Sequence, residues 1–514
     1  MVQNNVMEYR NPIISGYHPD PTICRVGEDY YIMNSSFEYF PGVPIYHSRN
    51  LANWELQGYV LSSRQQVDLE KITPSKGIYA PTLRYHDGYF FMCTTNVGKR
   101  GNFIVYSKDI LHGWSDPVWV EQEGIDPSLL FDDDGKVYFC TAVFDAGKEG
   151  IYICELNPFT GEKYTQTQLL TKGCGGKYAE GPHLYKWFGK YYLMMAEGGT
   201  EYGHMETIMR SDNPYGPYEP CPHNPIITHR NDMKEDIMCT GHGDIIEDAN
   251  GNWWMVCLGI RPITNENRRV LLHNLGRETF LAPVRWENGW PIVGMEGKEG
   301  MLELEMKGPL PGKSEEVDLD FSDDFRESSF KLDYNYLRNP EKENYLLCPE
   351  EGCLKLHGSK VTLSMEDTPT FLGIRQKEFK TIAGVKVRLG QGSEEARAGL
   401  TAYYNKSFHY DIYVGRNKDR FRAALGKQLF DVQLETAAEK LEEDSWVYLK
   451  MITDKEFYRF YYSLNGRDYT FLGQGLTAGL CTEITETMTF TGVYIGMFAE
   501  NGDAEFKEFS VRVL

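Results

Sequence analysis

The sequence lacks the features that mark membrane-spanning and nucleic-acid-binding proteins. None of its apolar runs approaches the ~18 residues that a membrane-spanning helix needs. Positive charge is also scarce, because 53 Lys and Arg face 74 Asp and Glu and give a formal net charge of −21 at pH 7. Such a surface repels nucleic acid and anionic lipid at long range, so we expect neither as a partner. A neutral substrate is the better match.

A secretory leader and paired cysteines are missing as well. The first ten residues, MVQNNVMEYR, do not combine a positively charged start with an apolar run. The eleven cysteines are odd in number and show none of the paired spacings of metal ligands, so we expect reduced, mostly buried thiols. Both features favour a cytoplasmic protein. A secretory leader that had been removed ahead of residue 1 would also be compatible with both features.

Residues 1–300 also lack extended helical periodicity, which argues against an α/β barrel. They contain instead a turn with Gly or Asp followed by an aromatic and β-branched run, repeated five times at starts 47 to 62 residues apart. The copies are GEDYYIMNSS (27–36), HDGYFFMCTT (86–95), DDGKVYFCTA (133–142), WFGKYYLMMA (187–196) and ANGNWWMVCL (249–258). This spacing suits a four-stranded propeller blade, so the sequence predicts an all-β chain that begins with a five-bladed β-propeller.

A second domain is expected, because a single core stops growing beyond about 250 to 300 residues. The segment MKGPLPGKSEEVD (306–318) is rich in Pro, Gly and charge and indicates a linker after a propeller of residues 1–305. Beyond it, segments such as HYDIYVGR, WVYLKMITD and FYRFYYSLNG alternate apolar and polar residues and end near turn-forming residues. Residues 319–514 are therefore predicted to form an antiparallel, jelly-roll-like β-sandwich.

Three carboxylates stand in apolar or Pro- and Gly-rich surroundings, where charged residues are uncommon. They are Asp20 in GYHPDPTIC, Asp126 in EGIDPSLLF and Glu180 in YAEGPHLYKW, and each precedes the aromatic run of a different repeat. Since the innermost strands of a propeller converge on its axis, equivalent positions of different blades meet at one face of the channel. For any one site a turn-forming Asp-Pro is an equally good interpretation. Three occurrences in phase favour a shared site, and paired carboxyl groups are what hydrolysis of a glycosidic bond requires.

These motifs resemble glycoside hydrolase family 43, the β-xylosidase and α-L-arabinofuranosidase family. The resemblance rests, in chain order, on HPDPTICRVGEDYYIMNSSFEYFPGVPIYHSRNLANW, IDPSLL, EGPHLYK, AEGGT and LGRET, and it covers nearly the whole chain. It implies an exo-acting, inverting hydrolase that releases terminal pentoses from xylo- or arabinoxylo-oligosaccharides, as a β-D-xylosidase, an α-L-arabinofuranosidase or both. It also implies that the C-terminal sandwich is concanavalin A-like and helps to shape the active site.

The same resemblance assigns a role to each carboxylate. By motif, Asp20 is the general base, Glu180 is the general acid, and Asp126 modulates the pKa of the acid and orients the sugar. A nearby like charge raises the pKa of a carboxyl group, which agrees with that last role. Inversion implies that base and acid lie about 6.5 to 9.5 Å apart, with a water molecule between them. No cofactor is required for this chemistry.

Five further residues are candidates for substrate binding. Arg277 in LGRET resembles the sugar-binding arginine of the family, with an unpaired surface arginine as the alternative interpretation. Phe37 matches an aromatic that packs on the terminal sugar, and Phe490 is a candidate contact from the sandwich, with ordinary core packing as the alternative for both. Tyr79 stands where family xylosidases often carry Trp. His242 in TGHGDII resembles a channel histidine that in some relatives binds Ca²⁺ through water, and the alternative is a buried histidine with ordinary partners.

Several functions stay open at this point. An endo-arabinanase-like hydrolase would share the carboxylates, but it usually lacks the sandwich and needs an open groove. A non-catalytic carbohydrate-binding propeller would not need all three carboxylates. Tyr79 and the segment TGHGDIIEDANGNWWMVCLGIRP leave the preference between xylosides and arabinofuranosides open. The sequence is compatible with a homo-oligomer and does not set the number of subunits.

Overall fold

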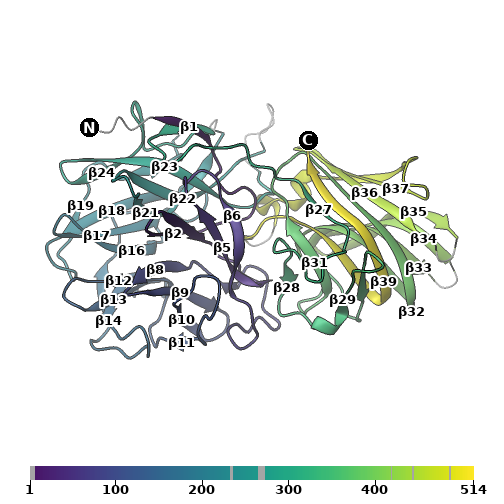
Figure 1. Cartoon of the computed structure of the whole chain (residues 1–514), viewed down its shortest axis with the longest axis horizontal. Helices are drawn as coiled ribbons and strands as arrows, with labels where there is room; N and C mark the ends of the chain where they lie inside the picture. Colours follow the sequence, from purple (N-terminus) through teal and green to yellow (C-terminus); the bar gives the residue numbers. More distant parts are fainter. Residues whose placement is uncertain (1–5, 232–235, 264–271, 418–419, 443–444, 486–487) are drawn as a thin grey trace.

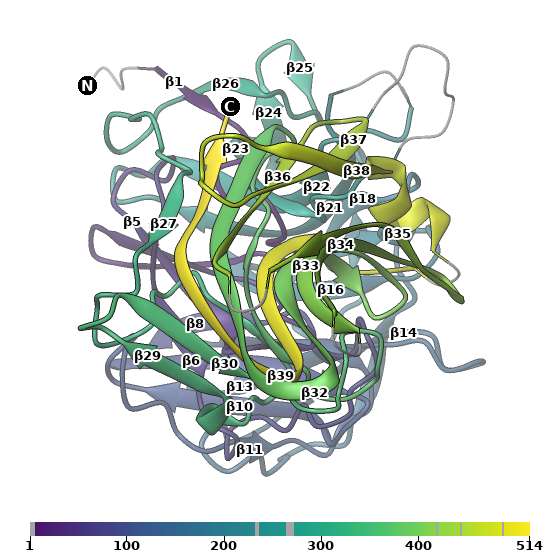
Figure 2. The same ribbon diagram turned by 90° about the vertical axis from the view of Figure 1, so that its right-hand side faces the viewer.

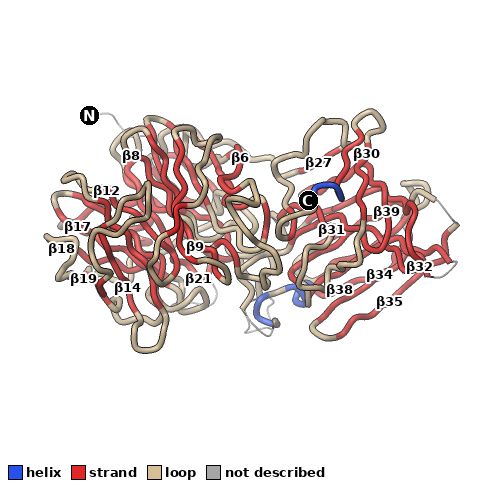
Figure 3. Tube along the Cα trace, turned by 90° about the horizontal axis from the view of Figure 1, so that it is seen from below, coloured by secondary structure: helices blue, strands red, loops and turns tan. Residues whose placement is uncertain are grey.

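The computed structural model describes residues 6–231, 236–263, 272–417, 420–442, 445–485 and 488–514. These residues form strands and loops, together with the short 3₁₀ helices η1 (Lys342–Asn344), η2 (Thr477–Leu480) and η3 (Thr482–Ile484) (Figure 3). No helix in these ranges is long and apolar enough to cross a bilayer. The predicted all-β class is confirmed.

The first part of the chain is a propeller of five antiparallel sheets, as predicted (Figure 1). Blade one contains β2 (Thr22–Val26), β3 (Asp29–Met33), β5 (Gly42–Ser48) and β6 (Glu55–Leu61). Blade two contains β7 (Gly77–Ile78), β8 (Thr82–His86), β9 (Tyr89–Val97), β10 (Gly101–Ser107) and β11 (Val118–Trp119). Blade three contains β12 (Ile125–Phe131), β13 (Val137–Val143), β14 (Gly150–Glu155) and β15 (Gln168–Thr171). Blade four contains β16 (Glu180–Trp187), β17 (Lys190–Glu197), β18 (Met205–Ser211), β19 (Glu219–Pro220) and β20 (Ile227–Thr228). Blade five contains β21 (Met238–Glu247), β22 (Trp253–Ile260), β23 (Glu278–Glu287), β24 (Trp290–Met295) and β25 (Lys298–Glu299).

The five repeats supply the second strand of each blade. In blades four and five these strands, β17 and β22, are buried along nearly their whole length, because neighbouring blades cover both of their faces. A strand buried on both faces needs a continuous apolar run, which explains YYLMMA and WWMVCL. The innermost strands β2, β8, β12, β16 and β21 contact one another around the axis, so residues at their starts share one face of the propeller.

The predicted linker begins as part of the propeller. Strand β26 (Glu305–Gly308) pairs with β1 (Met7–Arg10), because the backbone of this end segment finds its hydrogen-bond partners next to the chain start. Further on, the side chains of Asn50 and Asn53 donate hydrogen bonds to the backbone of Lys313 and Glu315. The connection between the domains therefore runs along blade one.

The C-terminal part is a sandwich built from one antiparallel sheet that folds over itself. Its strands are β27 (Phe321–Asp323), β29 (Tyr345–Cys348), β30 (Cys353–His357), β31 (Thr370–Arg375), β32 (Thr381–Asn405), β33 (Phe408–Asn417), β34 (Arg420–Leu429), β35 (Val432–Leu441), β36 (Val447–Thr453), β37 (Phe457–Ser463), β38 (Thr470–Leu476) and β39 (Tyr494–Val513). The long strands β32 and β39 pair with each other and curve through both layers (Figure 2). Register shifts around Gly392 allow β32 to pass from one layer to the other.

The two domains share an aromatic core. Strand β28 (Tyr336–Leu337) of the C-terminal part pairs with β4 (Tyr39–Phe40) of the propeller. Tyr39 stacks on Tyr494 with ring centroids 3.9 Å apart. The same buried cluster reaches Phe37, and the partly buried Tyr79 and Phe490 pack against it. This interface therefore reaches three of the residues predicted to bind substrate.

Candidate active site

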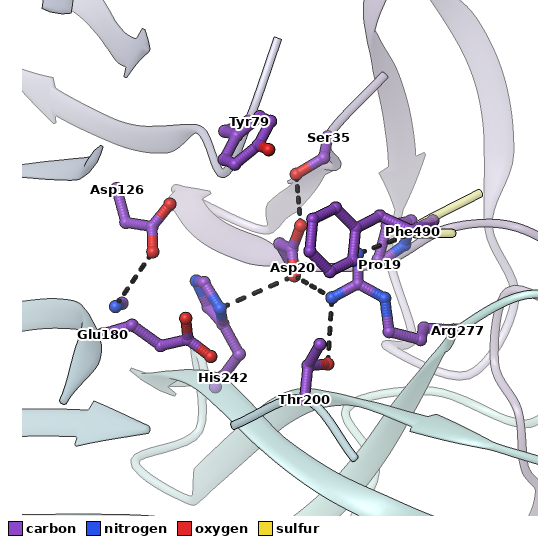
Figure 4. Close-up of polar contacts among 12 residues, drawn as sticks. Pro19, Asp20, Ser35, Tyr79, Asp126, Glu180, Thr200, His242, Arg277 and Phe490 are labelled. Carbon is purple, nitrogen blue, oxygen red and sulfur yellow. Dashed lines mark hydrogen bonds and ion pairs between the residues drawn. The ribbon is translucent and has the colours of Figure 1, made fainter. Parts of the chain in front are cut away.

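Local backbone geometry aims the three predicted carboxylates at the propeller axis. Asp20 and Asp126 adopt a left-handed backbone, with φ of 52° and 51°, which non-glycine residues rarely do. The pairing of β12 with β13 shifts register around Asp126, and that of β16 with β17 shifts register directly after Glu180. Such bulges turn a side chain away from its regular direction at the end of a strand. The carboxylates consequently meet at the start of their inner strands (Figure 4).

Asp20 is buried in a setting that favours its ionised form. Its carboxylate accepts hydrogen bonds from Ser35 Oγ at 2.5 Å and from Arg277 Nη1 at 3.1 Å, and it lies 3.5 Å from Nδ1 of His242 (Figure 4). Burial alone would raise the pKa of Asp20, but Arg277, His242 and Ser35 together outweigh burial and hold this pKa below its usual value. An ionised carboxylate is able to accept a proton from water, as a general base must.

Glu180 lies in the same pocket but favours its protonated form. Burial, followed by the negative charge of Asp20, raises the pKa of Glu180 to about 7, while Arg277 opposes this rise. Nε2 of His204 lies 3.9 Å from a carboxyl oxygen of Glu180. Nδ1 of His204 lies 2.9 Å from the carbonyl oxygen of Cys239, and since a carbonyl oxygen only accepts hydrogen bonds, the ring proton is on Nδ1. Burial lowers the pKa of His204 to about 3, so the ring is neutral and does not compete for the proton of Glu180.

Asp126 completes the group of three carboxyl groups. It accepts a hydrogen bond at 3.3 Å from the backbone N–H of Gly181, the residue that follows Glu180. Burial, and then the charges of Glu180 and Asp20, raise the pKa of Asp126 well above its usual value. Asp126 and Glu180 therefore titrate together, and the pair retains a proton near neutral pH. The structure brings the three predicted carboxylates together, and their individual roles stay predictions.

Arg277 is buried and held from three sides, which rules out the alternative of an unpaired surface arginine. Besides Asp20, its Nη1 donates to Thr200 Oγ1 at 3.1 Å, and its Nη2 donates to the carbonyl oxygen of Phe490 at 3.2 Å. The guanidinium carbon lies 5.8 Å from the ring centroid of Phe37 and 5.3 Å from that of Phe490. These contacts fix the guanidinium beside Asp20, where its remaining N–H on Nη2 can donate to a sugar hydroxyl.

The three candidate aromatics form one wall beside Asp20 and Arg277. Ring centroids lie 5.0 Å apart between Phe37 and Tyr79, 5.7 Å between Phe37 and Phe490, and 6.0 Å between Tyr79 and Phe490. Ser75 joins them, because its Oγ accepts the backbone N–H of Phe490 and its carbonyl oxygen accepts the Tyr79 hydroxyl. Phe37 is only 2% exposed, so it also belongs to the core, as the alternative interpretation stated.

The surroundings of His242 do not fit a calcium ion. Ca²⁺ prefers six to eight oxygen ligands, whereas Nδ1 of His242 faces Asp20 and its Nε2 would lie 2.7 Å from a Cβ atom on Gly181. Two residues further along the same strand, Asp244 accepts a hydrogen bond at 2.9 Å from the Arg84 guanidinium, a cation of the protein itself. Within the described ranges, no three His, Cys, Asp or Glu side chains converge on a metal position. A buried histidine with ordinary partners describes His242 better.

Sequence reasoning missed Ser35, Thr200 and His204. Ser35 and Thr200 stand in the quoted blocks that carry the family resemblance, in SSF and AEGGT, so their place in these motifs was a usable signal. His204, in YGHMET, has no comparable signal, because its importance depends on its complete burial next to Glu180.

Comparisons with known proteins agree with this site. The model of glycosyl hydrolases family 43 matches residues 9–291, and the model of the β-xylosidase C-terminal concanavalin A-like domain matches residues 322–512. A non-reducing end α-L-arabinofuranosidase of Bacteroides ovatus is 38% identical over 98% of this chain and 95% of its own length. A xylosidase/arabinosidase of Butyrivibrio fibrisolvens is 36% identical, over 87% of this chain and 89% of its own. The crystal structure of a xylan β-1,4-xylosidase of Bacillus halodurans superposes with a TM-score of 0.91 at 31% identity, covering 98% of this chain and all of that one.

Proposed function

The chain belongs to glycosyl hydrolases family 43, and from this membership we propose that it is an exo-acting, inverting glycosidase that removes terminal pentoses from neutral xylo- or arabinoxylo-oligosaccharides. Its relatives carry the names α-L-arabinofuranosidase, xylosidase/arabinosidase and β-xylosidase. Both kinds of activity release a pentose from a chain end, so dual activity is compatible with one pocket.

The opposite pKa shifts of two carboxyl groups in one pocket carry this proposal. Asp20 is held ionised and Glu180 is held protonated near neutral pH, which is the division of labour that glycoside hydrolysis requires. In the proposed reaction Asp20 takes a proton from water as the water oxygen bonds to the anomeric carbon. The bond from that carbon to the leaving oxygen breaks, and Glu180 gives its proton to this oxygen. Asp126 titrates together with Glu180 and keeps a proton on these two carboxyl groups near neutral pH. The proposed reaction uses no metal ion.

Closure of the pocket by the C-terminal domain supports action at chain ends. Phe490 comes from the sandwich, and its backbone binds both Arg277 and Ser75 of the propeller. A sugar bound against Arg277 would have this wall beyond it, which leaves no room for the chain to continue. An endo-arabinanase-like groove would need this side open, and a non-catalytic sugar-binding propeller would not need the paired carboxyl groups.

Initial rates on 4-nitrophenyl β-D-xylopyranoside and 4-nitrophenyl α-L-arabinofuranoside test the proposal. We expect turnover of at least one of them, and NMR of the first product should show inverted anomeric configuration. Asp20→Asn should lower kcat by about 10² to 10⁴-fold, because it removes the general base without changing the shape of the side chain. Retained configuration, or turnover only within long arabinan chains, would contradict the proposal.

A further inference from the structure

Two cysteines face each other at the tip of the hairpin formed by β29 and β30 in the sandwich (Figure 2). Cys348 is the last residue of β29 and Cys353 is the first residue of β30, and the antiparallel register pairs one directly with the other. Residues 349–352 make the turn between them. In the strand registers of the described residues, no other cysteine stands opposite a cysteine.

This register brings the two thiols within bonding reach. Residues directly opposite each other in an antiparallel pair have Cα atoms about 4.5 to 5.5 Å apart, which lies inside the range of about 4.4 to 6.8 Å that a disulfide spans. Such residues also project from the same face of the sheet. The two side chains interact directly, because burial, the charge of Cys348 and a hydrogen bond with Cys348 raise the pKa of Cys353 to about 12.

The two thiols differ in their access to solvent. Side chains alternate between the faces of a strand, so half-buried Cys348 shares the outer face of the sheet with Leu346, which is 57% exposed. Cys353 is fully buried. The charge of Cys348, followed by that of Glu351, raises the pKa of Lys355, so the ammonium group of Lys355 lies beside Cys348. A partly exposed thiol beside a cation is the kind that reacts with external disulfides.

We propose that Cys348 and Cys353 are a modification site, and that they form a reversible disulfide when the protein meets a low-molecular-weight disulfide such as oxidised glutathione. The thiolate of Cys348 attacks one sulfur of the glutathione disulfide, so that a mixed disulfide forms and one glutathione thiolate leaves. Cys353 then gives up its proton, and its sulfur attacks Sγ of Cys348 and displaces the second glutathione. Two protein thiols are oxidised in this way, and one glutathione disulfide is reduced to two thiols.

The first step prepares the second. In the mixed disulfide Cys348 carries no charge, which removes one of the causes that raise the pKa of Cys353. Cys353 therefore loses its proton more easily once Cys348 has reacted. Before that, burial protects Cys353 from the external disulfide, so the order of the two attacks is set by the fold.

The disulfide would fasten a segment that helps to hold the two domains together. Tyr345, the first residue of β29, packs edge-to-face on Tyr336 with ring centroids 4.8 Å apart, and Tyr336 lies in β28, which pairs with β4 of the propeller. Arg64 of the propeller donates hydrogen bonds to the carbonyl oxygens of Asn339 and Pro340 in the same segment. Closing the hairpin removes conformations chiefly from the unfolded chain, so the oxidised protein should melt at a higher temperature.

Mass spectrometry of the full chain tests the pair. The protein is incubated with oxidised glutathione, its remaining thiols are alkylated in denaturant, and trypsin then releases both cysteines in one peptide, residues 343–355, which contains no other cysteine. We expect this peptide to be lighter by two hydrogen atoms and to carry neither glutathione nor an alkyl group. Reduction with dithiothreitol before alkylation should restore both alkyl groups. The oxidised protein should melt about 4 °C above the reduced one.

Two serine variants separate the steps. Cys353→Ser should stop the reaction after the first attack, so that Cys348 keeps its glutathione. Cys348→Ser is the matched control, because buried Cys353 should then remain a free thiol under the same exposure. Neither variant should show the rise in melting temperature. The inference is overturned if the wild-type peptide keeps glutathione on Cys348, or if both of its cysteines are alkylated after oxidation. None of these measurements uses glycosidase activity, so the proposed function stands or falls separately.

Discussion

The dependence of activity on pH should follow from the environments of two carboxyl groups. Glu180 must hold a proton and Asp20 must have lost one, so kcat/KM on an oligosaccharide should be constant between about pH 4 and pH 7. The lower limit reflects an Asp20 pKa held below its usual value of 3.8, and the upper limit reflects a Glu180 pKa of about 7. Above pH 7 the rate should fall about tenfold per pH unit, to roughly 1% of the plateau at pH 9.

A comparison of two leaving groups distinguishes the titration of Glu180 from that of other groups in the protein. A 4-nitrophenolate leaves without much help from a proton, so the decline above pH 7 should be shallow on the aryl glycoside and steep on xylobiose or arabinofuranosyl-xylobiose. Glu180→Gln should abolish the alkaline limb on the aryl glycoside and lose most of the activity on the oligosaccharide, by about 10² to 10⁴-fold. Initial rates across the pH range, with activity re-measured at pH 7 after each exposure, give both profiles. Identical alkaline limbs on the two substrates, or a limb near the ordinary Glu value of 4.5, would refute the assignment of Glu180.

Two further predictions concern the geometry of the pocket. Gly181→Ala would place a Cβ atom 2.7 Å from Nε2 of His242 at a φ of +56°, so kcat/KM should fall about a hundredfold with an unchanged circular dichroism spectrum. Gly135→Ala also has a positive φ but meets no atom within 4 Å, and it should keep its activity. Dialysis against EDTA should leave the rate unchanged, because His242 already has protein partners and Arg84 supplies the positive charge beside Asp244. Loss of activity that added CaCl₂ restores would contradict this last prediction.

Much of the fold was predictable because the propeller repeats itself in the sequence. Each blade needs a second strand that is buried on both faces, and such strands leave a continuous apolar run that recurs at blade length. The strands of the sandwich were harder to predict from the sequence, because β32 and β39 each pass from one layer to the other without a turn. Gly392 and Asn501 look like turn residues in the sequence, but they lie within long strands whose register shifts instead.

The residues of the candidate active site were likewise predictable from the sequence only in part. The carboxylates were predictable because Asp20 and Asp126 stand before Pro in strained segments that recur in phase with the blades. His204 was not predictable, since a histidine in a short polar segment reveals nothing about burial against Glu180. The setting of His242 depends on Gly181 of another blade, and a contact between blades leaves no local pattern in the sequence.

Closure of the pocket depends on two glycines from different domains. A Cβ atom on Gly492 would lie 2.2 Å from the carbonyl oxygen of Leu275, and one on Gly276 would lie 3.0 Å from the backbone of Gly492. This close approach of two backbones brings the carbonyl oxygen of Phe490 to within 3.2 Å of Arg277. A pocket built in this way can admit a longer chain past Arg277 only if the two domains separate. The proposed selectivity for chain ends is therefore a property of the domain interface, whereas the chemistry belongs to the propeller alone.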